Sequence, residues 1–261
     1  MIVKKYNFTF NKKRYILIFF PKSKPKLRDL IPNNSVDIHS HLLPGIDDGS
    51  RSIEDTNYLL SEMTKIGFTS IITTPHIFAN VWNNTEKSIE DKFIETKSLI
   101  DNSIELKNIG FASEYMIDSY FMKRLEVEKL LTIKDNMILI EMSYLSAPIQ
   151  LYEIIFEIQV KGYQPILAHP ERYNFYHENY KEYTKLKDAG CLFQLNLLST
   201  VDYYGKNITK NADRLLKDDL IDFIGSDIHH KNHIASFNRK IGIKNIKKLE
   251  EAIEKNLFFI K

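Results

Sequence analysis

The stretch Val36-Asp-Ile-His-Ser-His-Leu-Leu-Pro-Gly-Ile-Asp-Asp-Gly49 decides the fold and points to the site. It opens as a short apolar strand, carries His39 and His41 at its end, and runs into a glycine-bounded turn with Asp47 and Asp48. Residues two apart on an extended chain point to the same side, so the two imidazoles converge on one point. The stretch therefore predicts a strand whose carboxyl end presents metal-binding groups.

Outward from this stretch, short apolar strands alternate with helical segments, which is the rhythm of a parallel sheet or barrel. Strands are expected at residues 36–39, 69–73, 107–112, 137–141, 164–168, 192–197 and 222–226. Helices are expected at residues 53–66, 86–101, 149–161, 179–189, 209–218 and 245–256. No linker or repeat divides residues 35–261, so we expect one domain there. The alternation alone fits a closed barrel and an open doubly wound sheet equally well.

Histidines and carboxylates stand at the ends of these strands, and their placement favours a barrel. Five of the eight histidines and four acidic residues share this position: His39, His41, Asp47, His76, Glu114, Glu141, His169, Asp227 and His229. Barrel enzymes build their sites at the face where the strands end. We therefore expect these nine side chains to meet.

Such a concentration of charge predicts bound cations, because unpaired buried charges cost several kcal/mol each. Nitrogen and oxygen ligands without sulfur suit Mn²⁺, Fe²⁺ or Zn²⁺. Nine ligands exceed what one ion takes, so two or three divalent ions are expected. Close-set ions serve phosphoryl transfer, and Arg172 offers a planar donor to phosphate oxygens. The competing interpretation of Arg172 is a surface salt bridge.

Other chemistries lack their motifs. The single cysteine, Cys191, has Leu197 where a cysteine phosphatase needs arginine, and it opens an apolar strand, so we expect it in the core. The sequence also has no Gly-x₄-Gly-Lys-Ser/Thr and no Gly-x-Ser-x-Gly. Phosphate-loop and serine-elbow mechanisms are therefore excluded.

Charge divides the chain into two parts. Residues 1–28 hold nine Lys or Arg and no acid, which leaves 27 basic against 34 acidic residues in the remainder. We expect a basic extension at residues 1–34, either a solvated leader or a segment that touches anionic lipid peripherally. The longest apolar run, Tyr15–Phe20, is far shorter than the roughly 20 residues of a spanning helix. A cytoplasmic location, at most at the inner face of the membrane, is expected.

Four segments together resemble a known superfamily: Val36–Gly49, Thr74-Pro-His76, Ala168-His-Pro-Glu-Arg-Tyr173 and Ser226-Asp-Ile-His229. They resemble the PHP (polymerase and histidinol phosphatase) superfamily, and within it the bacterial protein-tyrosine phosphatases encoded beside capsule and exopolysaccharide genes. The resemblance covers about residues 30–261. It implies a distorted seven-stranded (β/α) barrel with three metal ions, commonly manganese. It also implies removal of phosphate from the tyrosine-rich tail of a bacterial tyrosine kinase that controls polysaccharide export.

The same resemblance implies a role for each residue. The three ions would be held by His39, His41, Glu114 and Asp227, by Glu114, Glu141 and His169, and by Asp47, His76 and His229. Arg172 would steady the phosphoryl oxygens. Asp48 would be an acid that assists the leaving tyrosyl oxygen.

The segment after the last strand departs from the family pattern. Relatives often carry an arginine shortly after the final Asp-x-His, whereas this chain has His229-His-Lys-Asn-His233. Lys231 and His233 are candidate substitutes, although a lysine is a point charge and no planar fork. His230 and His233 are expected on a mobile, exposed loop. Four aromatic residues are expected at the mouth, either against a phosphotyrosine ring or covering the rim: Phe78, Trp82, Tyr173 and Phe175.

Three alternatives stay open from the sequence. A small-molecule phosphatase of the same fold, acting on histidinol phosphate, would need a closed pocket with an acid for the substrate's ammonium group. A metal-dependent nuclease would need a basic groove, which the acidic excess of residues 29–261 disfavours, so no nucleic-acid partner is expected. A metal-stabilised binding module would lose no activity on Arg172→Ala.

Overall fold

The structure, a computed structural model, describes residues 23–260, and its strands are all parallel. They are β1 (Ser35–Asp37), β2 (Phe68–Thr73), β3 (His76–Ile77), β4 (Asn108–Phe111), β5 (Glu114–Met116), β6 (Met137–Glu141), β7 (Gln164–Ala168), β8 (Leu192–Asn196) and β9 (Phe223–Gly225). One sheet has the order β1-β2-β4 and the other β3-β5-β6-β7-β8-β9. β3 continues β2 and β5 continues β4, each after a two-residue interruption. With these joined, seven strands remain.

The circuit closes where β9 meets β1. Ser40 pairs with Ile228 in a parallel bridge, and the amide of Asp227 donates to the carbonyl of His39 over 2.7 Å. Deeper in, Asp37 accepts from the amide and the hydroxyl of Ser226 at 2.7 and 2.9 Å. The expected distorted (β/α)₇ barrel is therefore confirmed. The interruptions that distort it were not expected, because β3 and β5 are too short to give a sequence pattern and Pro75 lacks the amide that would continue the ladder.

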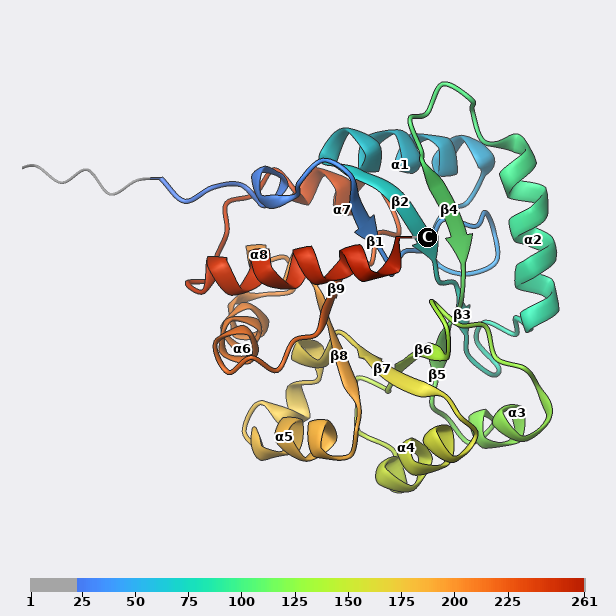
Figure 1. Cartoon of the computed structure of the whole chain (residues 1–261), viewed down its shortest axis with the longest axis vertical. Coiled ribbons are helices and arrows are strands. Elements are labelled where there is room, and N and C mark those ends of the chain that lie inside the picture. Colours follow the sequence, from blue (N-terminus) through green and yellow to red (C-terminus); the bar gives the residue numbers. More distant parts are fainter. Residues whose placement is uncertain (1–22, 261) are drawn as a thin grey trace, which may run out of the picture.

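Helices form the outer layer around the strands (Figure 1). They are α1 (Ile53–Ile66), α2 (Glu86–Leu99), α3 (Phe121–Val127), α4 (Leu151–Val160), α5 (Lys181–Asp188), α6 (Lys206–Lys217), α7 (Lys231–Ser236) and α8 (Ile246–Lys255). Short 3₁₀ turns are η1 (Leu27–Leu30), η2 (Pro170–Arg172), η3 (Asn174–Tyr176), η4 (Leu197–Val201) and η5 (Asn256–Phe259). The six expected helices are present, α1 with the expected bounds. α3 and α7 were not expected, since six or seven residues give too short a period to detect.

Two apolar clusters explain how the barrel aims its side chains. One lies within the barrel and includes Leu139 and Ile166, and the other lies between barrel and helices and includes Ile138 and Ile140. On β6, side chains alternate between the two faces, so Glu141 shares the inward face with Leu139. The last residue of this strand is therefore delivered to the mouth of the barrel.

The described part of the expected extension packs on the barrel. Leu27 is fully buried, and its amide donates to the carbonyl of Arg239 at 3.0 Å. The ammonium of Lys24 donates to the carbonyls of Gly242 and Ile243, both at 2.9 Å. Residues 24–34 therefore belong structurally with the domain expected at 35–261. The membrane-contact hypothesis concerns mainly residues 1–22, which lie outside the described residues.

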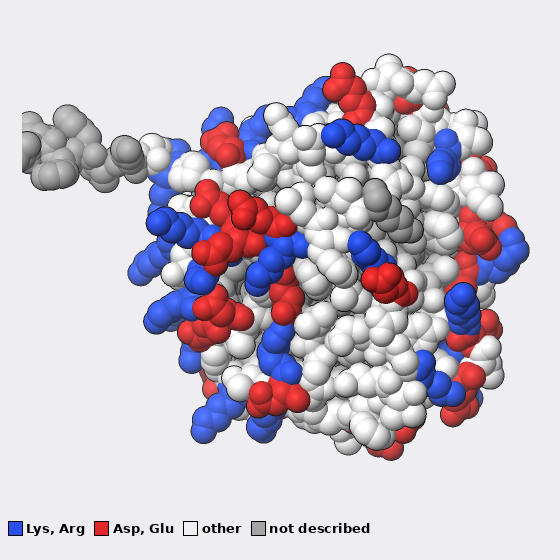
Figure 2. Space-filling model, viewed as in Figure 1, with Lys and Arg blue, Asp and Glu red and all other residues white. Residues whose placement is uncertain are grey.

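Acidic and basic side chains are interspersed on the face shown in Figure 2. On α8, for example, Lys248 pairs with Asp219 and Glu251 at 2.8 and 3.0 Å. Such mixing is typical of a solvated surface. Within residues 23–260, every helix is too short or too polar to cross a bilayer.

Candidate metal centre

The nine expected ligands come from six strand ends and lie within one site. The inner half of the site consists of buried side chains: His39, His41, Glu114, His169 and Asp227. The outer half is partly exposed: Asp48, His76 and His229. Glu141 lies between the halves. Four groups have ligand atoms close enough to share an ion: His39 with Glu114 and His169; His39 with His41 and Asp227; His76 with Glu114 and Glu141; and His41 with Asp48, His76 and His229.

Glu114 is the centre of the inner half. Its Oε2 lies 3.1 Å from Nε2 of His39 and 3.4 Å from Nε2 of His41. Nδ1 of His76 approaches the same oxygen at 3.2 Å, and its Oε1 lies 3.0 Å from Nε2 of His169. The register that pairs His76 with Glu114 across β3 and β5 places these two side by side. One carboxylate thus faces four imidazoles.

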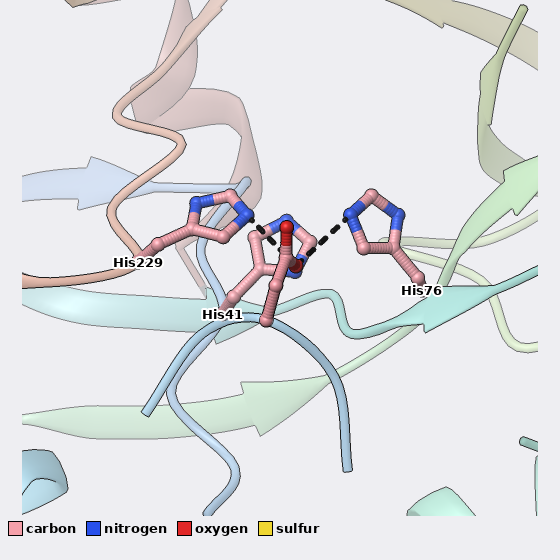
Figure 3. Close-up of side chains that lie close together, drawn as sticks. His41, His76 and His229 are labelled. Carbon is pink, nitrogen blue, oxygen red and sulfur yellow. Dashed lines mark ion pairs between the residues drawn. The ribbon is translucent and has the colours of Figure 1, made fainter. Parts of the chain in front are cut away.

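Asp48 is the centre of the outer half, where Figure 3 shows His76 and His229 on opposite sides of one carboxylate, beside His41. Its Oδ1 lies 3.5 Å from Nε2 of His76 and 3.4 Å from Nε2 of His229. The resemblance had placed Asp47 in this group and Asp48 outside it. In the structure Asp48, and not Asp47, lies among His41, His76 and His229.

Asp47 supports the inner half by contacts to His41 and to two backbone amides on the side away from Glu114. Its Oδ2 lies 2.8 Å from Nδ1 of His41 and accepts from the amide of His76 at 3.2 Å, while its Oδ1 accepts from the amide of Gly49 at 2.9 Å. Because Nδ1 of His41 faces this carboxylate, Nε2 is free to face the centre. This carboxylate–histidine arrangement fixes tautomer and ring orientation in metal sites.

Two residues of β8 support the site and were missed in the sequence. Oε1 of Gln194 lies 2.7 Å from Nδ1 of His39, and the Asn196 amide donates to Oδ2 of Asp227 at 2.8 Å. Both side chains are fully buried. A signal was present, since Leu192-Phe-Gln-Leu-Asn196 places two polar residues two apart in an apolar strand. That spacing puts them on one face.

Two glycines, Gly225 and Gly49, pack so closely against His39 and His41 that no side chain fits at their positions. A Cβ on Gly225 would lie 2.6 Å from Cβ of His39 and 2.5 Å from Nε2 of Gln194. A Cβ on Gly49 would lie 2.2 Å from the carbonyl oxygen of His41. These distances are too short for a real Cβ, so the close approach of His39, Gln194 and His41 restricts both positions to glycine.

Strained backbone marks two further ligand positions. His169 has φ of 36° and Asp227 has φ of 51°, in the left-handed region that residues other than glycine seldom adopt. Each residue in such a conformation lowers the stability of the fold by about 1–3 kcal/mol, and residues of this kind are concentrated at functional sites. Here the strain turns both side chains into the mouth of the barrel.

The electrostatics of the site attract positive charge. Burial opposes ionisation, but the charges of His39 and His76 hold the pKa of Glu114 well below its ordinary value. Burial likewise opposes protonation of His41, yet Asp47 raises the pKa of that imidazole well above its ordinary value. Glu114 therefore stays ionised, and His41 binds a cation or a proton strongly.

These residues fit divalent ions. Among residues 23–260, Oε2 of Glu114 and Nδ1 of His76 are buried without a hydrogen-bond partner, although each lies near several polar atoms. Five carboxylates and five imidazoles around one guanidinium, all oxygen and nitrogen, are a donor set for Mn²⁺, Fe²⁺ or Zn²⁺. Ions would satisfy both orphaned atoms at once.

A pocket of about 270 Å³ opens over this cluster, and Arg172 forms one side of it. Nη1 of Arg172 donates to Oδ2 of Asp227 at 2.8 Å. The guanidinium lies between two aromatic rings, 4.7 Å from the centroid of Tyr144 and 4.1 Å from that of Tyr204. Arg172 is thus fixed at the site and is no surface salt bridge.

The aromatic wall differs from the expected one. Tyr173 is fully buried and its hydroxyl accepts from the amide of Met142, so it does not reach the mouth. Phe78 pairs with Trp82 in an isolated bridge, and neither lines the pocket, nor does Phe175. Tyr144 and Tyr204 line it instead. They were missed because they follow β6 and β8 in loops without a motif.

The expectation of a mobile, exposed loop at His230 and His233 was wrong for His233. That residue is buried in α7, and its Nδ1 lies 3.0 Å from the carbonyl of Asp227 and 3.2 Å from the amide of His229. His230 is exposed at the start of this helix. Lys231 points away from the pocket and lies 5.9 Å from the ring centroid of Tyr58. Cys191 is buried, as expected.

Fold and site together define a class, the α/β-barrel proteins with a histidine–carboxylate cluster at the strand ends. Residues 35–260 match the family described as capsular polysaccharide synthesis, CpsB/CapC, and the chain belongs to this family. Similar proteins include tyrosine-protein phosphatase CpsB of Streptococcus pneumoniae, 30% identical over 75% of this chain and 83% of that protein. Tyrosine-protein phosphatase YwqE of Bacillus subtilis is also 30% identical, over 75% of this chain and 77% of its own.

Solved structures agree with this assignment. A structure from work on YwqE of B. subtilis and CpsB of S. pneumoniae, described as metal-dependent tyrosine phosphatases, has a TM-score of 0.71 and 28% identity. It covers 84% of this chain and 86% of that one. An amidohydrolase from Mycoplasma synoviae, 13% identical with a TM-score of 0.50, covers 90% and 86% and shows likeness of fold alone.

Proposed function

We propose that this protein is a metal-dependent protein-tyrosine phosphatase that removes phosphate from a bacterial tyrosine kinase in capsular or exopolysaccharide synthesis. The convergence of four imidazoles on Glu114, beside a fixed arginine in an open pocket, is the observation that carries the proposal. The family and the names of its members support the substrate class and the capsule link.

Three ions are proposed, with manganese first and iron or zinc as alternatives. We propose three ligand sets: His39, His41, Glu114 and Asp227; Glu114, Glu141 and His169, joined by His76; and Asp48, His76 and His229. The second set combines two groups whose atoms lie close enough to share an ion, one with Glu114 and His169 and one with His76, Glu114 and Glu141. When bound, such ions lower the pKa of water and neutralise charge that develops on a phosphoryl group.

The protein's own side chains orient the substrate. Arg172 presents its remaining N–H groups to phosphoryl oxygens while Asp227 and the rings of Tyr144 and Tyr204 hold its plane. The same rings form apolar walls on which a phenyl ring stacks. Binding energy is thus available for an aryl phosphate before the bond breaks.

Asp48 is better suited to a ligand role than to the acid role expected for it. Burial opposes ionisation, but hydrogen bonding and charge from His229, with His76, hold the pKa of Asp48 below its ordinary value. A carboxylate that stays ionised cannot donate a proton. A phenolate leaves with less protonation than an alkoxide does, so a site without a dedicated acid suits phosphotyrosine.

We place the reaction in the cytoplasm, where a tyrosine kinase tail would be reached. The test is turnover of a phosphotyrosine peptide and of histidinol phosphate by purified protein, with the metal content measured in parallel. We expect peptide turnover that a chelator abolishes and Mn²⁺ restores, and Arg172→Ala should lower kcat/KM by about 10²-fold. Preference for histidinol phosphate would favour the small-molecule alternative, and activity unchanged in Arg172→Ala would contradict the proposal.

A further inference from the structure

A second cavity adjoins the candidate metal centre on the side of α1. Its volume is about 410 Å³, against about 270 Å³ for the catalytic pocket. The two cavities share Asp48, His229 and His230 as lining residues, so they are contiguous across one ridge of side chains. A polypeptide with a side chain in the first cavity would therefore lay a neighbouring residue over the second.

Cationic side chains without partners line this second cavity. Arg51, in the turn before α1, and Lys231, at the start of α7, both face it. Among the described residues, neither makes an ion pair or a side-chain hydrogen bond to an acidic group. Lys231 instead lies 5.9 Å from the ring centroid of Tyr58, at the edge of the same cavity.

The carboxylates of the same lining make no ion pair with these two cations. Asp48 is engaged by His76 and His229 at 3.5 and 3.4 Å. Asp55 is the remaining carboxylate of the lining, and it lies in the first turn of α1, where an acid is stabilised by the helix dipole. Because neither carboxylate of the lining pairs with them, Arg51 and Lys231 are available to an acidic group of a bound polypeptide.

We propose that this cavity, lined by Arg51 and Lys231, is a subsite for an acidic residue next to the phosphotyrosine of the polypeptide substrate. The inference rests on the proposed function and deepens it, because it turns general phosphotyrosine chemistry into a preference for acidic sequences. Arg51 would bind the carboxylate as a fork and Lys231 as a point charge. Neither residue lines the pocket over the histidine–carboxylate cluster, so both would act on substrate selection alone.

The experiment compares phosphotyrosine peptides that differ only in the flanking residues, with Glu, Ala or Lys on either side, and includes free phosphotyrosine as a reference. With Mn²⁺, wild-type protein should prefer the Glu peptide to the Ala peptide by about three- to fivefold in kcat/KM, through KM, the effect of one exposed ion pair. The preference should fade at about 1 M salt, where the screening length is near 3 Å.

Variants that remove a positive or a negative charge from the cavity should change the preference for acidic peptides in opposite directions. Arg51→Ala should remove the preference and leave the Ala peptide and free phosphotyrosine unchanged, whereas Asp55→Asn should increase the preference about twofold. Lys65→Ala, at the far end of α1 and paired with Glu62, is the matched control and should change nothing. Equal turnover of Glu and Lys peptides by wild-type protein, or an Arg51→Ala loss shared by all substrates, overturns the subsite alone. Absence of turnover on every phosphotyrosine substrate overturns the proposed function and the subsite together.

Discussion

The inner and outer halves of the site use the same chemical groups in opposite surroundings. In the inner half, His39, His41 and Glu114 are fully buried, and each histidine has a dedicated side-chain partner on its second nitrogen, Gln194 or Asp47. In the outer half, the Asp48 side chain is 55% exposed and depends on two imidazoles for its position. We therefore expect the preorganised inner ligands to hold ions more tightly than the outer position, whose ion should exchange with solvent more easily.

The largest effect in this comparison is expected from Glu114→Gln. It removes the charge that four imidazoles share and leaves buried groups without compensation. We expect kcat to fall on the order of 10³-fold, with loss of more than one ion per chain. Metal analysis and phosphotyrosine turnover measure both outcomes. Glu126→Gln, on the exposed surface of α3, is the control, and an active, fully metallated Glu114→Gln protein would contradict the central place of this carboxylate.

Substitutions of the neighbouring aspartates Asp47 and Asp48 test the two halves of the site separately. Asp47→Asn keeps every proposed ligand but removes the negative charge and one of the two acceptor oxygens behind His41, so we expect activity to fall about 10- to 100-fold with weaker metal binding in the inner half. Asp48→Asn should release one ion of three and lower activity about tenfold, with the inner ions retained. Metal titration by calorimetry on both variants compares them. If Asp47→Asn lost a whole ion while Asp48→Asn lost none, the original assignment from the resemblance would hold.

The sequence alone could not predict which of Asp47 and Asp48 faces the outer histidines. The strand ends and their histidines were predictable because a strand alternates its side chains and parallel strands finish at one edge. In the turn at residues 44–49, no period relates position to direction, and either aspartate satisfies the motif. Only the hydrogen bonds of Asp47 to the amides of Gly49 and His76 fix which carboxylate turns outward.

The same reason explains the aromatic walls and α7. Tyr144 and Tyr204 lie in loops that meet at Arg172, a contact between distant segments that no local pattern encodes. His233 is buried because α7 forms, and a helix of six residues is stabilised by packing more than by propensity. By contrast, the burial of Cys191 was predictable, since it opens an apolar strand.

The smallest expected effect comes from competition between protons and metal ions for the imidazoles of the site. Burial opposes protonation of His76, but the charges of Glu141 and Glu114 raise its pKa to about 9. Burial and the charge of Arg172 instead lower the pKa of His169. A metal ion displaces the proton from an imidazole, so binding at His76 releases a proton below about pH 9, and the affinity there falls as the pH falls, by up to about tenfold per pH unit. Binding at His169 releases none at neutral pH.

Calorimetry at pH 7 in two buffers of different ionisation enthalpy counts these protons. Because the pKa values of His41 and His76 are both raised, we expect proton release on ion binding in both halves, and Asp48→Asn should remove the part that accompanies the outer ion. Proton release that is the same in Asp48→Asn as in the wild-type protein would contradict a proton on His76 that the outer ion displaces.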